Sequence, residues 1–468
     1  MHEVFASLAA HAGTRGARIA LSDDRGAVGY RALCARVAAL AAALPDAAAT
    51  IAICGRAGVS WIVADLAATL AGRRVVPVPG FFSPAQRRHV LCDSGAQLLL
   101  RCDPPAHRRT DASGLPELRV DGHARVADTV LPRYAGDAER VIYTSGTTGA
   151  PKGVVHGERQ IAHAIQAIAA AVGASADDRH LCALPASLLL EQIAGVFIPL
   201  AVGARSHVSA LATEAAMAGD ASALLALYSR TAPSTTVLVP QLLAAMSAAA
   251  HAGTWTAPAS LRFAAVGGAP VPIALLRAAR AHGIPVIRGY GLSECASVVA
   301  VERPGALTDE TDGGCGTPVP GVRVNVEQGE LVVRGPTLMR GYLNTAALSE
   351  PAWRTGDTGR LGPAGMVVVS GRRDRVLVLP SGRNVCADWV EAAALADPRV
   401  AAARLTLGAD GAPELSATLR PGLACDGERS LRDAVLAALA CLPAYARPAR
   451  IHFSGGDRIM PSTSPART

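Results

Sequence analysis

Charged residues are scarce in this chain of 468 residues: Asp, Glu, Lys and Arg make up only 18% of it, while half of its residues are apolar. A chain of this length has room for two or three domains and a large buried core. The formal net charge is +7, but the arginines are scattered and form no basic block, which argues against a nucleic-acid partner. The composition predicts a compact, alanine-rich globular protein.

The ten cysteines lack any metal or disulfide pattern. They extend from Cys34 to Cys441 without a CxxC pair and without a Cys/His cluster. This spacing argues against a structural zinc site and a disulfide framework, and favours a reducing, cytoplasmic compartment. The N-terminal segment carries Glu3 and has no basic stretch before an apolar block, so we expect no signal peptide.

One apolar stretch, residues 181–204, is long enough on paper to cross a bilayer. Glu191 and Gln192 stand at its centre, and Pro185 and Pro199 interrupt it. These residues are costly or disruptive in a lipid-facing helix. We therefore predict a buried strand–turn–helix segment and no integral membrane segment.

Helix-like and strand-like segments alternate along the first 300 residues, a pattern typical of parallel sheets wrapped by helices. After about Pro304, strand-like runs at 329–335 and 365–370 indicate a more antiparallel subdomain. The last hundred residues have the size of a small independent domain. The fold class is therefore α/β: a large N-terminal domain of two helix-wrapped sheets with a smaller β-rich subdomain (1–371), a linker (372–375) and a small α+β C-terminal domain (376–468).

The stretch YTSGTTGAPKGV, residues 143–154, combines glycines, hydroxyls and one lysine. It follows a strand-like end, at the sheet edge where α/β folds bind ligands. The glycines let the backbone approach an anion, the hydroxyls can donate to phosphate oxygens, and Lys152 adds a point charge. Pro151 and Gly153 flank the lysine, so it is not a Walker P-loop. The stretch predicts a polyphosphate site; alone, it is also compatible with a surface turn carrying an incidental lysine.

Six further segments follow in order: VGGAP (266–270), GYGLSE (289–294), GELVVRGPTLMRGYLN (329–344), WRTGD (353–357), GRRDRVLVLPSGRNV (371–385) and LPAYARP (442–448). Together with the loop, they resemble the motifs of the adenylate-forming superfamily. This superfamily includes acyl- and aryl-CoA synthetases, nonribosomal peptide adenylation domains and beetle luciferases. The resemblance covers most of the chain, from residue 143 to residue 448.

The resemblance implies a two-step reaction with ATP and Mg²⁺ as cofactors. A carboxylate attacks the α-phosphate of ATP, giving an acyl-adenylate and pyrophosphate, and the acyl group then passes to a pantetheine thiol. Such chemistry depends on positioning and charge neutralisation. The implied partners are a small carboxylic acid, ATP, and either CoA or an acyl carrier protein.

The family's roles transfer to matching positions of this sequence. By resemblance, Tyr290 stacks on adenine, Glu294 ligates Mg²⁺ and Asp357 accepts hydrogen bonds from the ribose hydroxyls. Taken singly, Asp357 could be a turn residue and Glu294 a solvated helix start. The implied phosphate-binding residues are Thr144, Ser145, Gly146, Thr147, Thr148, Gly149 and Lys152. The implied adenine- and ribose-binding residues are Gly268, Ala269, Pro270, Tyr290, Gly291, Ser293, Asp357 and Arg372.

The small domain carries the remaining implied roles. The family resemblance makes Asp374 a hinge about which a mobile C-terminal domain rotates, and places Gly382 beside a pantetheine tunnel. Where the family usually ends in Gly-Lys with a catalytic lysine, this chain has Ala466 and Arg467. Arg467 either replaces that lysine with a differently shaped cation or belongs to a frayed tail.

The acid substrate is expected to be hydrophobic, either fatty or aromatic. Amino-acid-activating relatives carry an aspartate in the segment matching residues 184–195, and this chain has none there. We assign the acid pocket to Ser187, Leu188, Leu189, Val266, Gly267 and Leu292, although leucine runs are also usual core. The alternatives are an acyl- or aryl-acyl-carrier-protein ligase, and a non-catalytic nucleotide-binding homologue that has lost the terminal lysine.

Overall fold

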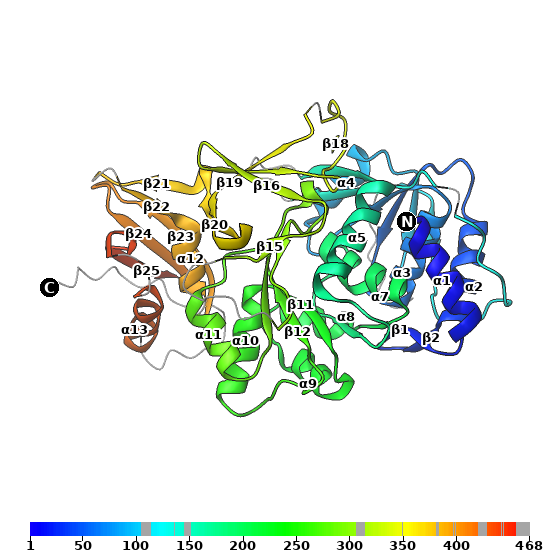
Figure 1. The fold of residues 1–468 in the computed structure, drawn as a ribbon, viewed down its shortest axis with the longest axis horizontal. Helices are drawn as coiled ribbons and strands as arrows, with labels where there is room; N and C mark the ends of the chain where they lie inside the picture. Colours follow the sequence, from blue (N-terminus) through cyan, green and yellow to red (C-terminus); the bar gives the residue numbers. More distant parts are fainter. Residues whose placement is uncertain are drawn as a thin grey trace.

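The computed structural model describes residues 1–103, 114–134, 136–144, 151–305, 314–348, 350–380, 383–395, 397, 399–419, 428–440, 442 and 444–454. Within them the strands form two large sheets, a four-stranded sheet and two smaller ones. Figure 1 shows the large sheets and their helices in blue to green, the four-stranded sheet in yellow, and the C-terminal elements in orange and red at one end. No helix in this part of the chain is long and apolar enough to span a bilayer.

The larger sheet runs in the order β15-β14-β13-β12-β11-β9-β10-β1-β2. From β13 to β1 neighbouring strands are parallel, while β2, β14 and β15 are antiparallel to their neighbours. Its strands are β1 (Ile19–Asp23), β2 (Gly26–Gly29), β9 (Arg179–Cys182), β10 (Arg205–Val208), β11 (Thr235–Leu238), β12 (Phe263–Val266), β13 (Val286–Tyr290), β14 (Ala300–Val301) and β15 (Thr317–Pro318).

The second large sheet has the order β18-β8-β7-β4-β3-β5-β6. Strands β7 and β8 form an antiparallel hairpin around the glycine-rich loop, and β18 adds to the outer edge of β8. Its strands are β3 (Thr50–Cys54), β4 (Arg74–Pro77), β5 (Leu98–Arg101), β6 (Glu117–Arg119), β7 (Glu139–Thr144), β8 (Lys152–Gly157) and β18 (Gly341–Tyr342).

Helices cover both sheets and bury their apolar faces. One hydrophobic core extends across the two sheets, and a second lies beneath the other face of the larger sheet. The helices are α1 (His2–Arg15), α2 (Tyr30–Ala43), α3 (Val59–Leu70), α4 (Pro84–Asp93), α5 (Glu158–Val172), α6 (Leu189–Glu191), α7 (Ile198–Val202), α8 (Ala210–Met217), α9 (Ser222–Thr231), α10 (Pro240–His251) and α11 (Ile273–Ala281). The predicted fold class of helix-wrapped sheets is confirmed.

Residues 181–204 form the predicted buried strand–turn–helix segment. The end of β9 leads through a turn into α6, a π-helix η1 (Gln192–Phe197) and α7. Arg140 donates to Asp65 at 2.6 Å and to Gln192 at 2.8 Å, so the polar centre of this segment is satisfied by buried partners. A π-helix is rare and often marks a functional region.

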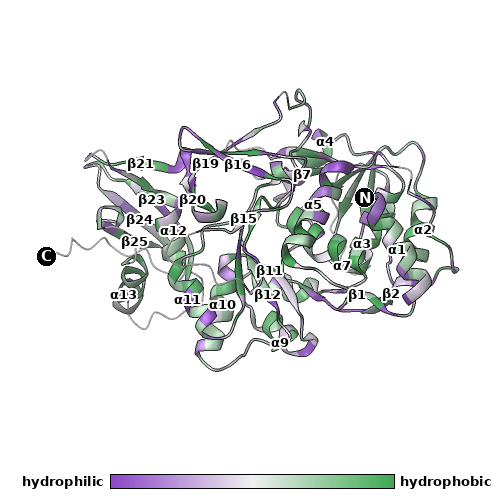
Figure 2. Ribbon diagram, in the orientation of Figure 1, coloured by the Kyte–Doolittle hydropathy of each residue, from purple (hydrophilic) through white to green (hydrophobic). Residues whose placement is uncertain are grey.

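The four-stranded antiparallel sheet consists of β16 (Arg323–Glu327), β17 (Glu330–Arg334), β19 (Trp353–Leu361) and β20 (Val367–Arg372). Hydrophilic residues recur along this sheet (Figure 2), and some of them form ion pairs, such as Arg354 with Glu330 at 2.8 Å. Short 3₁₀ turns lie nearby: η2 (Ser293–Cys295), η3 (Pro363–Gly365) and η4 (Arg373–Arg375).

The C-terminal elements bury a hydrophobic core of their own, which runs from Leu379 to Phe453. A separate core is what an independent domain requires. The division at residues 372–375 stays a prediction. The elements are β21 (Val376–Val378), β22 (Asn384–Cys386), α12 (Ala387–Leu395), β23 (Val400–Leu407), β24 (Pro413–Leu419), α13 (Glu428–Leu439), η5 (Ala444–Ala446) and β25 (Arg450–Ser454).

Candidate active site

The two segments with predicted adenine-binding roles follow the carboxyl ends of neighbouring parallel strands. Strands β12 and β13 pair in parallel, so Gly267 and Gly291 leave the same edge of the sheet. A Cβ on Gly291 would lie 1.6 Å from the carbonyl oxygen of Ser297, so glycine alone fits there. Gly268 has a φ of +80°, in the region that favours glycine. These glycines are needed for the backbone path itself.

Asp357 joins the adenine segment to the four-stranded sheet. The hydroxyl of Tyr290 donates to its carboxylate at 2.6 Å, and Arg372 lies 3.4 Å away on the paired strand. Burial is the main cause that raises the pKa of Asp357, and Tyr290 and Arg372 oppose that shift. Burial, together with the charge of Asp357, also raises the pKa of Tyr290. The structure therefore brings together three residues with predicted adenine and ribose roles.

Tyr342 connects the predicted phosphate-binding lysine to the predicted magnesium ligand. Its hydroxyl donates to Glu294 at 2.8 Å, and the Lys152 ammonium lies 5.6 Å from the centroid of its ring. The backbone amide of Met339 donates to the Glu294 carbonyl at 2.8 Å. Burial is the main cause that raises the pKa of Tyr342. We call Lys152, Tyr290, Glu294, Tyr342, Asp357 and Arg372 the nucleotide corner.

Tyr342 had no role in the sequence interpretation, although it lies within the segment at 329–344. The feature that could have pointed to Tyr342 is its place in β18, a two-residue strand that pairs with β8 just after Lys152. The pairing can only be recognised once the sheet is known.

Lys152 is the only lysine in the chain, since 44 of its 45 basic residues are arginines. It begins β8, pairs with Thr144 across the hairpin, and is exposed. His89 donates to the carbonyl oxygen of the preceding Pro151 at 2.9 Å. The rest of the predicted phosphate loop (Ser145, Gly146, Thr147, Thr148, Gly149) lies outside the described residues, as do Gly382 and Arg467.

A cavity of about 290 Å³, here called the acid cavity, opens beside the nucleotide corner and continues beneath the larger sheet. Its lining includes five residues of the predicted acid pocket: Leu188, Leu189, Val266, Gly267 and Leu292. Gly268, Tyr290, Gly291 and Ser293 line the same cavity. The predicted acid and adenine residues therefore share one continuous space.

Ser187, the sixth predicted pocket residue, lies elsewhere. It lines a second cavity of about 820 Å³, together with Arg56 and Arg87. The amide of Leu188 donates to Pro185 at 3.0 Å, and this turn separates Ser187 from the leucines that follow. Counting along the sequence could not show which side of the turn each residue faces.

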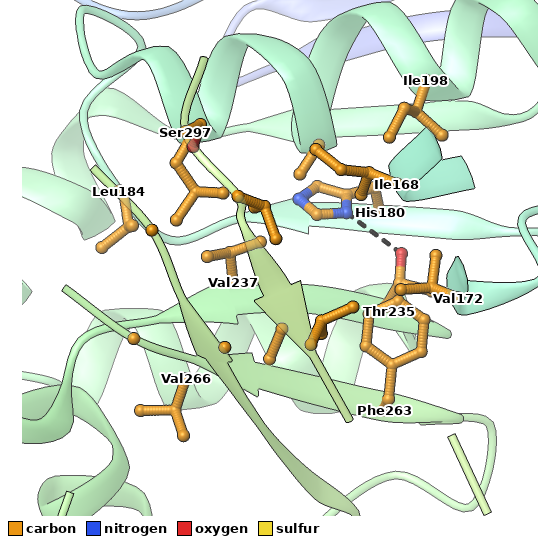
Figure 3. A pocket seen from close by; sticks show the side chains of 18 of the residues that line it. Ile168, Val172, His180, Leu184, Ile198, Thr235, Val237, Phe263, Val266 and Ser297 are labelled. Carbon is orange, nitrogen blue, oxygen red and sulfur yellow. Dashed lines mark hydrogen bonds between the residues drawn. The ribbon is translucent and has the colours of Figure 1, made fainter. Parts of the chain in front are cut away.

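The acid cavity has a polar floor that the sequence interpretation missed (Figure 3). His180 Nδ1 lies 3.0 Å from the Thr235 hydroxyl, and its Nε2 donates to Glu191 at 3.1 Å. The other oxygen of Glu191 accepts from the Leu184 amide at 3.0 Å. His180 and Glu191 are almost fully buried. Each of these groups has a hydrogen-bonding partner within the protein, as buried polar groups require.

This floor corrects the expectation that the chain has no Cys/His cluster. The ligand atoms of His180, Cys182 and Glu191 all lie within 4.8 Å of one another. Such a set could hold a transition metal. Burial raises the pKa of the Cys182 thiol well above its usual value, and its sulfur lies 3.4 Å from the Ser206 hydroxyl, so this group too has a partner within the protein. We interpret the cluster as a hydrogen-bond network supporting the cavity floor.

Neighbouring arginines attach the predicted hinge to different parts of the molecule. Arg373 pairs with Glu330 of the four-stranded sheet at 3.2 Å. Two residues later, Arg375 pairs with Glu391 of α12 at 2.6 Å. Asp374, the predicted hinge residue, is exposed between these two anchors. The chain thus passes from one set of ion pairs to another across a single residue.

These features define a class of protein, an α/β nucleotide-binding enzyme with an apolar substrate cavity. Residues 8–343 match the family model described as AMP-binding enzyme, and the chain belongs to this family. A 2-succinylbenzoate–CoA ligase of Bacillus licheniformis is 30% identical over 368 residues, which cover 73% of each chain. A long-chain-fatty-acid–CoA ligase of Mycobacterium bovis is 28% identical over 429 residues, covering 73% of this chain and 68% of that one.

Solved structures agree with this assignment. The o-succinylbenzoate CoA synthetase of Bacillus subtilis, in complex with its acyl-adenylate intermediate, matches with a TM-score of 0.77 and 25% identity, covering 97% of this chain and 94% of that one. The same enzyme in complex with ATP and magnesium ion matches with a TM-score of 0.76 and 25% identity, covering 97% of this chain and 96% of that one. The predicted superfamily and the predicted class of activity, AMP-forming acid–thiol ligation, are confirmed.

Proposed function

We propose that this protein uses ATP and Mg²⁺ to activate an apolar monocarboxylic acid as its acyl-adenylate and then transfers the acyl group to the thiol of CoA. The observation that carries the proposal is the shared cavity. Tyr290 and Gly268, with predicted adenine roles, line the same space as a long apolar wall. An acid bound along that wall would present its carboxylate beside the nucleotide, as adenylation requires.

The nucleotide corner supports each part of the proposed chemistry. Asp357 can accept hydrogen bonds from two ribose hydroxyls when it is ionised. The carboxylate of Glu294 suits Mg²⁺, which prefers hard oxygen ligands and neutralises phosphate charge when bound. Tyr342 would hold that carboxylate in place, and Lys152 would supply positive charge to the departing pyrophosphate. The remaining predicted phosphate-binding residues and Arg467 belong to the same proposal.

Among the described residues of the cavity lining, no arginine or lysine is left without an acidic partner for a second substrate carboxylate. 2-Succinylbenzoate, named for several relatives, is a dicarboxylic acid. Among the described residues that line the acid cavity, Arg262 is the one arginine or lysine, and it pairs with Asp178 at 3.0 Å. We therefore propose a monocarboxylic acid.

CoA is the proposed thiol because the named relatives are CoA ligases. The pantetheine arm of a carrier protein has the same reactive end, so an acyl-carrier-protein ligase remains the alternative. Transfer would follow rotation of the small domain about Asp374, between its two arginine anchors.

The direct test is pyrophosphate release from ATP and Mg²⁺ with fatty, benzoic and amino acids, followed by thioester formation with CoA or a carrier protein. We expect release with apolar acids and a thioester with CoA. If pyrophosphate is released and a thioester forms with a carrier protein but not with CoA, the carrier protein would replace CoA as the proposed acceptor. No release with any acid would favour the non-catalytic alternative.

The single lysine allows a second test without mutagenesis. An amine-reactive acetylating reagent can modify Lys152 and the N-terminal amine alone, and that amine is paired with Glu158 at 3.3 Å. We expect ATP and Mg²⁺ to protect Lys152 from modification, as measured by peptide mass spectrometry. Equal modification with and without nucleotide would contradict its phosphate-binding role.

A further inference from the structure

The acid cavity follows the larger sheet along the length of its strands. Alternate residues of each strand share one face of a sheet. Three residues of β11 and its end (Thr235, Val237, Val239) and three of β12 and its end (Phe263, Ala265, Gly267) line the cavity in this alternation. Arg262 at one end of β12, and Val266 and Gly268 at the other, line it as well. Figure 3 shows Val266 and Leu184 towards one end of the cavity and Phe263 and Val172 towards the other. The cavity therefore runs from the carboxyl ends of the strands to their amino ends.

Its length follows from strand geometry. Phe263 and Gly267 are four residues apart, which corresponds to about 13 Å of strand. Arg262 and Gly268 are six residues apart, which corresponds to about 20 Å. An extended chain advances about 1.2 Å per backbone bond, as the span of an extended peptide shows. An unbranched alkyl chain of about 10 to 16 carbons would fill this length.

Apolar side chains line the long walls. Helix α5 contributes Ile168 and Val172, and α7 contributes Ile198 and Val202, opposite the sheet. Ala265, in a central strand with helices on both faces of its sheet, is nevertheless only partly buried. Accessible surface at such a position shows that the helices leave space above it.

His180 and Arg262, two polar residues in the walls, already have partners within the protein. His180 is bonded to Thr235 and Glu191. At the far end Arg262 pairs with Asp178 and donates to the Val172 carbonyl at 2.8 Å. A ligand along this path would meet methyl and methylene groups for most of its length.

We propose that the acid is an unbranched fatty acid of about 10 to 16 carbons, whose tail lies along the sheet from Gly267 towards Arg262. This inference rests on the proposed function and names its substrate class. A benzoic acid would occupy only the end near Gly267 and leave the rest of the cavity unfilled. Each added methylene should improve binding about fourfold until the tail reaches Arg262.

The experiment is a chain-length series of saturated acids from 4 to 20 carbons, with benzoate for comparison. We expect kcat/KM for pyrophosphate release to rise steeply with length, reach a maximum between 10 and 16 carbons, and fall beyond. A maximum at 6 carbons or fewer, or a preference for benzoate, would overturn the inference and leave the proposed function intact. If no acid releases pyrophosphate, calorimetric binding of the same acids still tests the cavity: a Kd independent of length would overturn it.

Two substitutions at different depths locate the tail. Ala265→Phe fills the cavity about 7 Å beyond Gly267, so the preferred length should fall to about six carbons and acids of 12 carbons or more should lose over 100-fold relative to hexanoate. Val172→Trp, at the far end, should impair only acids of 14 carbons or more. If Ala265→Phe does not fold, Val172→Trp alone decides.

The matched control is Ala278→Phe on the exposed face of α11, which should keep the wild-type length profile. Unchanged length profiles in both cavity variants would show that the tail lies elsewhere.

Discussion

The nucleotide corner and the acid cavity use polar residues in opposite ways. In the corner, Tyr290 bonds to Asp357 and Tyr342 to Glu294, next to the space where a ligand would bind. At the floor of the cavity, His180 bonds to Thr235 and to the buried Glu191. Residues of the corner keep hydrogen-bonding capacity for a ligand, whereas those of the cavity floor use theirs in bonds to other groups of the protein. Substitutions should therefore separate binding from stability.

The largest expected effect is on stability, at the cavity floor. Glu191→Ala leaves His180 and the Leu184 amide without their acceptor in a buried site, so the free energy of unfolding should fall by about 4 kcal/mol. The affinity of the folded protein for ATP should stay within twofold. Chemical denaturation and nucleotide titration measure the two. Glu350→Ala, at an exposed glutamate, is the matched control and should change stability by less than about 0.5 kcal/mol.

The next effect reverses this pattern, in the nucleotide corner. Asp357→Asn keeps an acceptor for Tyr290 but removes the charge, and hydrogen bonds to charged groups contribute about 1.5–3 kcal/mol each. We expect kcat/KM for ATP to fall about 100-fold with stability at pH 7 unchanged or slightly higher. A loss of stability comparable to that of Glu191→Ala would remove the distinction between the two regions.

The pH dependence of ATP use should trace to the same carboxyl group. Because burial raises the pKa of Asp357, it takes up a proton at higher pH than an exposed aspartate. KM for ATP should rise as pH falls through that pKa, approaching tenfold per pH unit. The effect of Asp357 on folding stability runs the other way. Its stabilising contribution is fully present below its pKa in the unfolded chain and is lost as pH rises through its higher pKa in the folded protein. Asp357→Asn should flatten both profiles; an unchanged slope would assign the titration to another group.

The smallest effect tests Tyr342 as a positioning residue. Tyr342→Phe keeps the ring beneath Lys152 but removes the hydrogen bond to Glu294, which should raise the Mg²⁺ concentration for half-maximal rate about threefold to fivefold. The maximal rate at saturating Mg²⁺ should change less than that. Tyr445→Phe, at a more exposed tyrosine among the C-terminal elements, is the control. A lower maximal rate with an unchanged Mg²⁺ requirement would argue against the assigned role.

Residues assigned to the nucleotide corner lie together, whereas one residue of the predicted acid pocket, Ser187, lines another cavity. Tyr290, Asp357 and Arg372 were assigned from short motifs and lie together. Asp357 and Arg372 face each other across β19 and β20, and the hydroxyl of Tyr290, at the end of β13, reaches Asp357 at 2.6 Å. The alternation of helix-like and strand-like segments also predicted the α/β fold. The π-helix η1 and the short strand β18 had no local signal.

Ser187 shows where counting along the chain fails. Ser187 and Leu188 are neighbours in the sequence, but Leu188 lines the acid cavity and Ser187 lines the second cavity, because a turn directs the two residues to opposite sides. Likewise, the three residues His180, Cys182 and Glu191 meet only because β9 and the α6 segment fold against each other.

By itself, the sequence determined which reactive groups this protein carries: glycines where only glycine fits, a single lysine, and the carboxylates of Glu294 and Asp357 within short motifs. The tertiary structure alone decided the shape of the acid cavity. Its walls come from α5, α6, α7, β11 and β12, each contributing one to three apolar residues of the kind that usually forms an ordinary core. Whether such a face is packed or left open depends on how closely the helices approach the sheet, and no local pattern of residues encodes that distance.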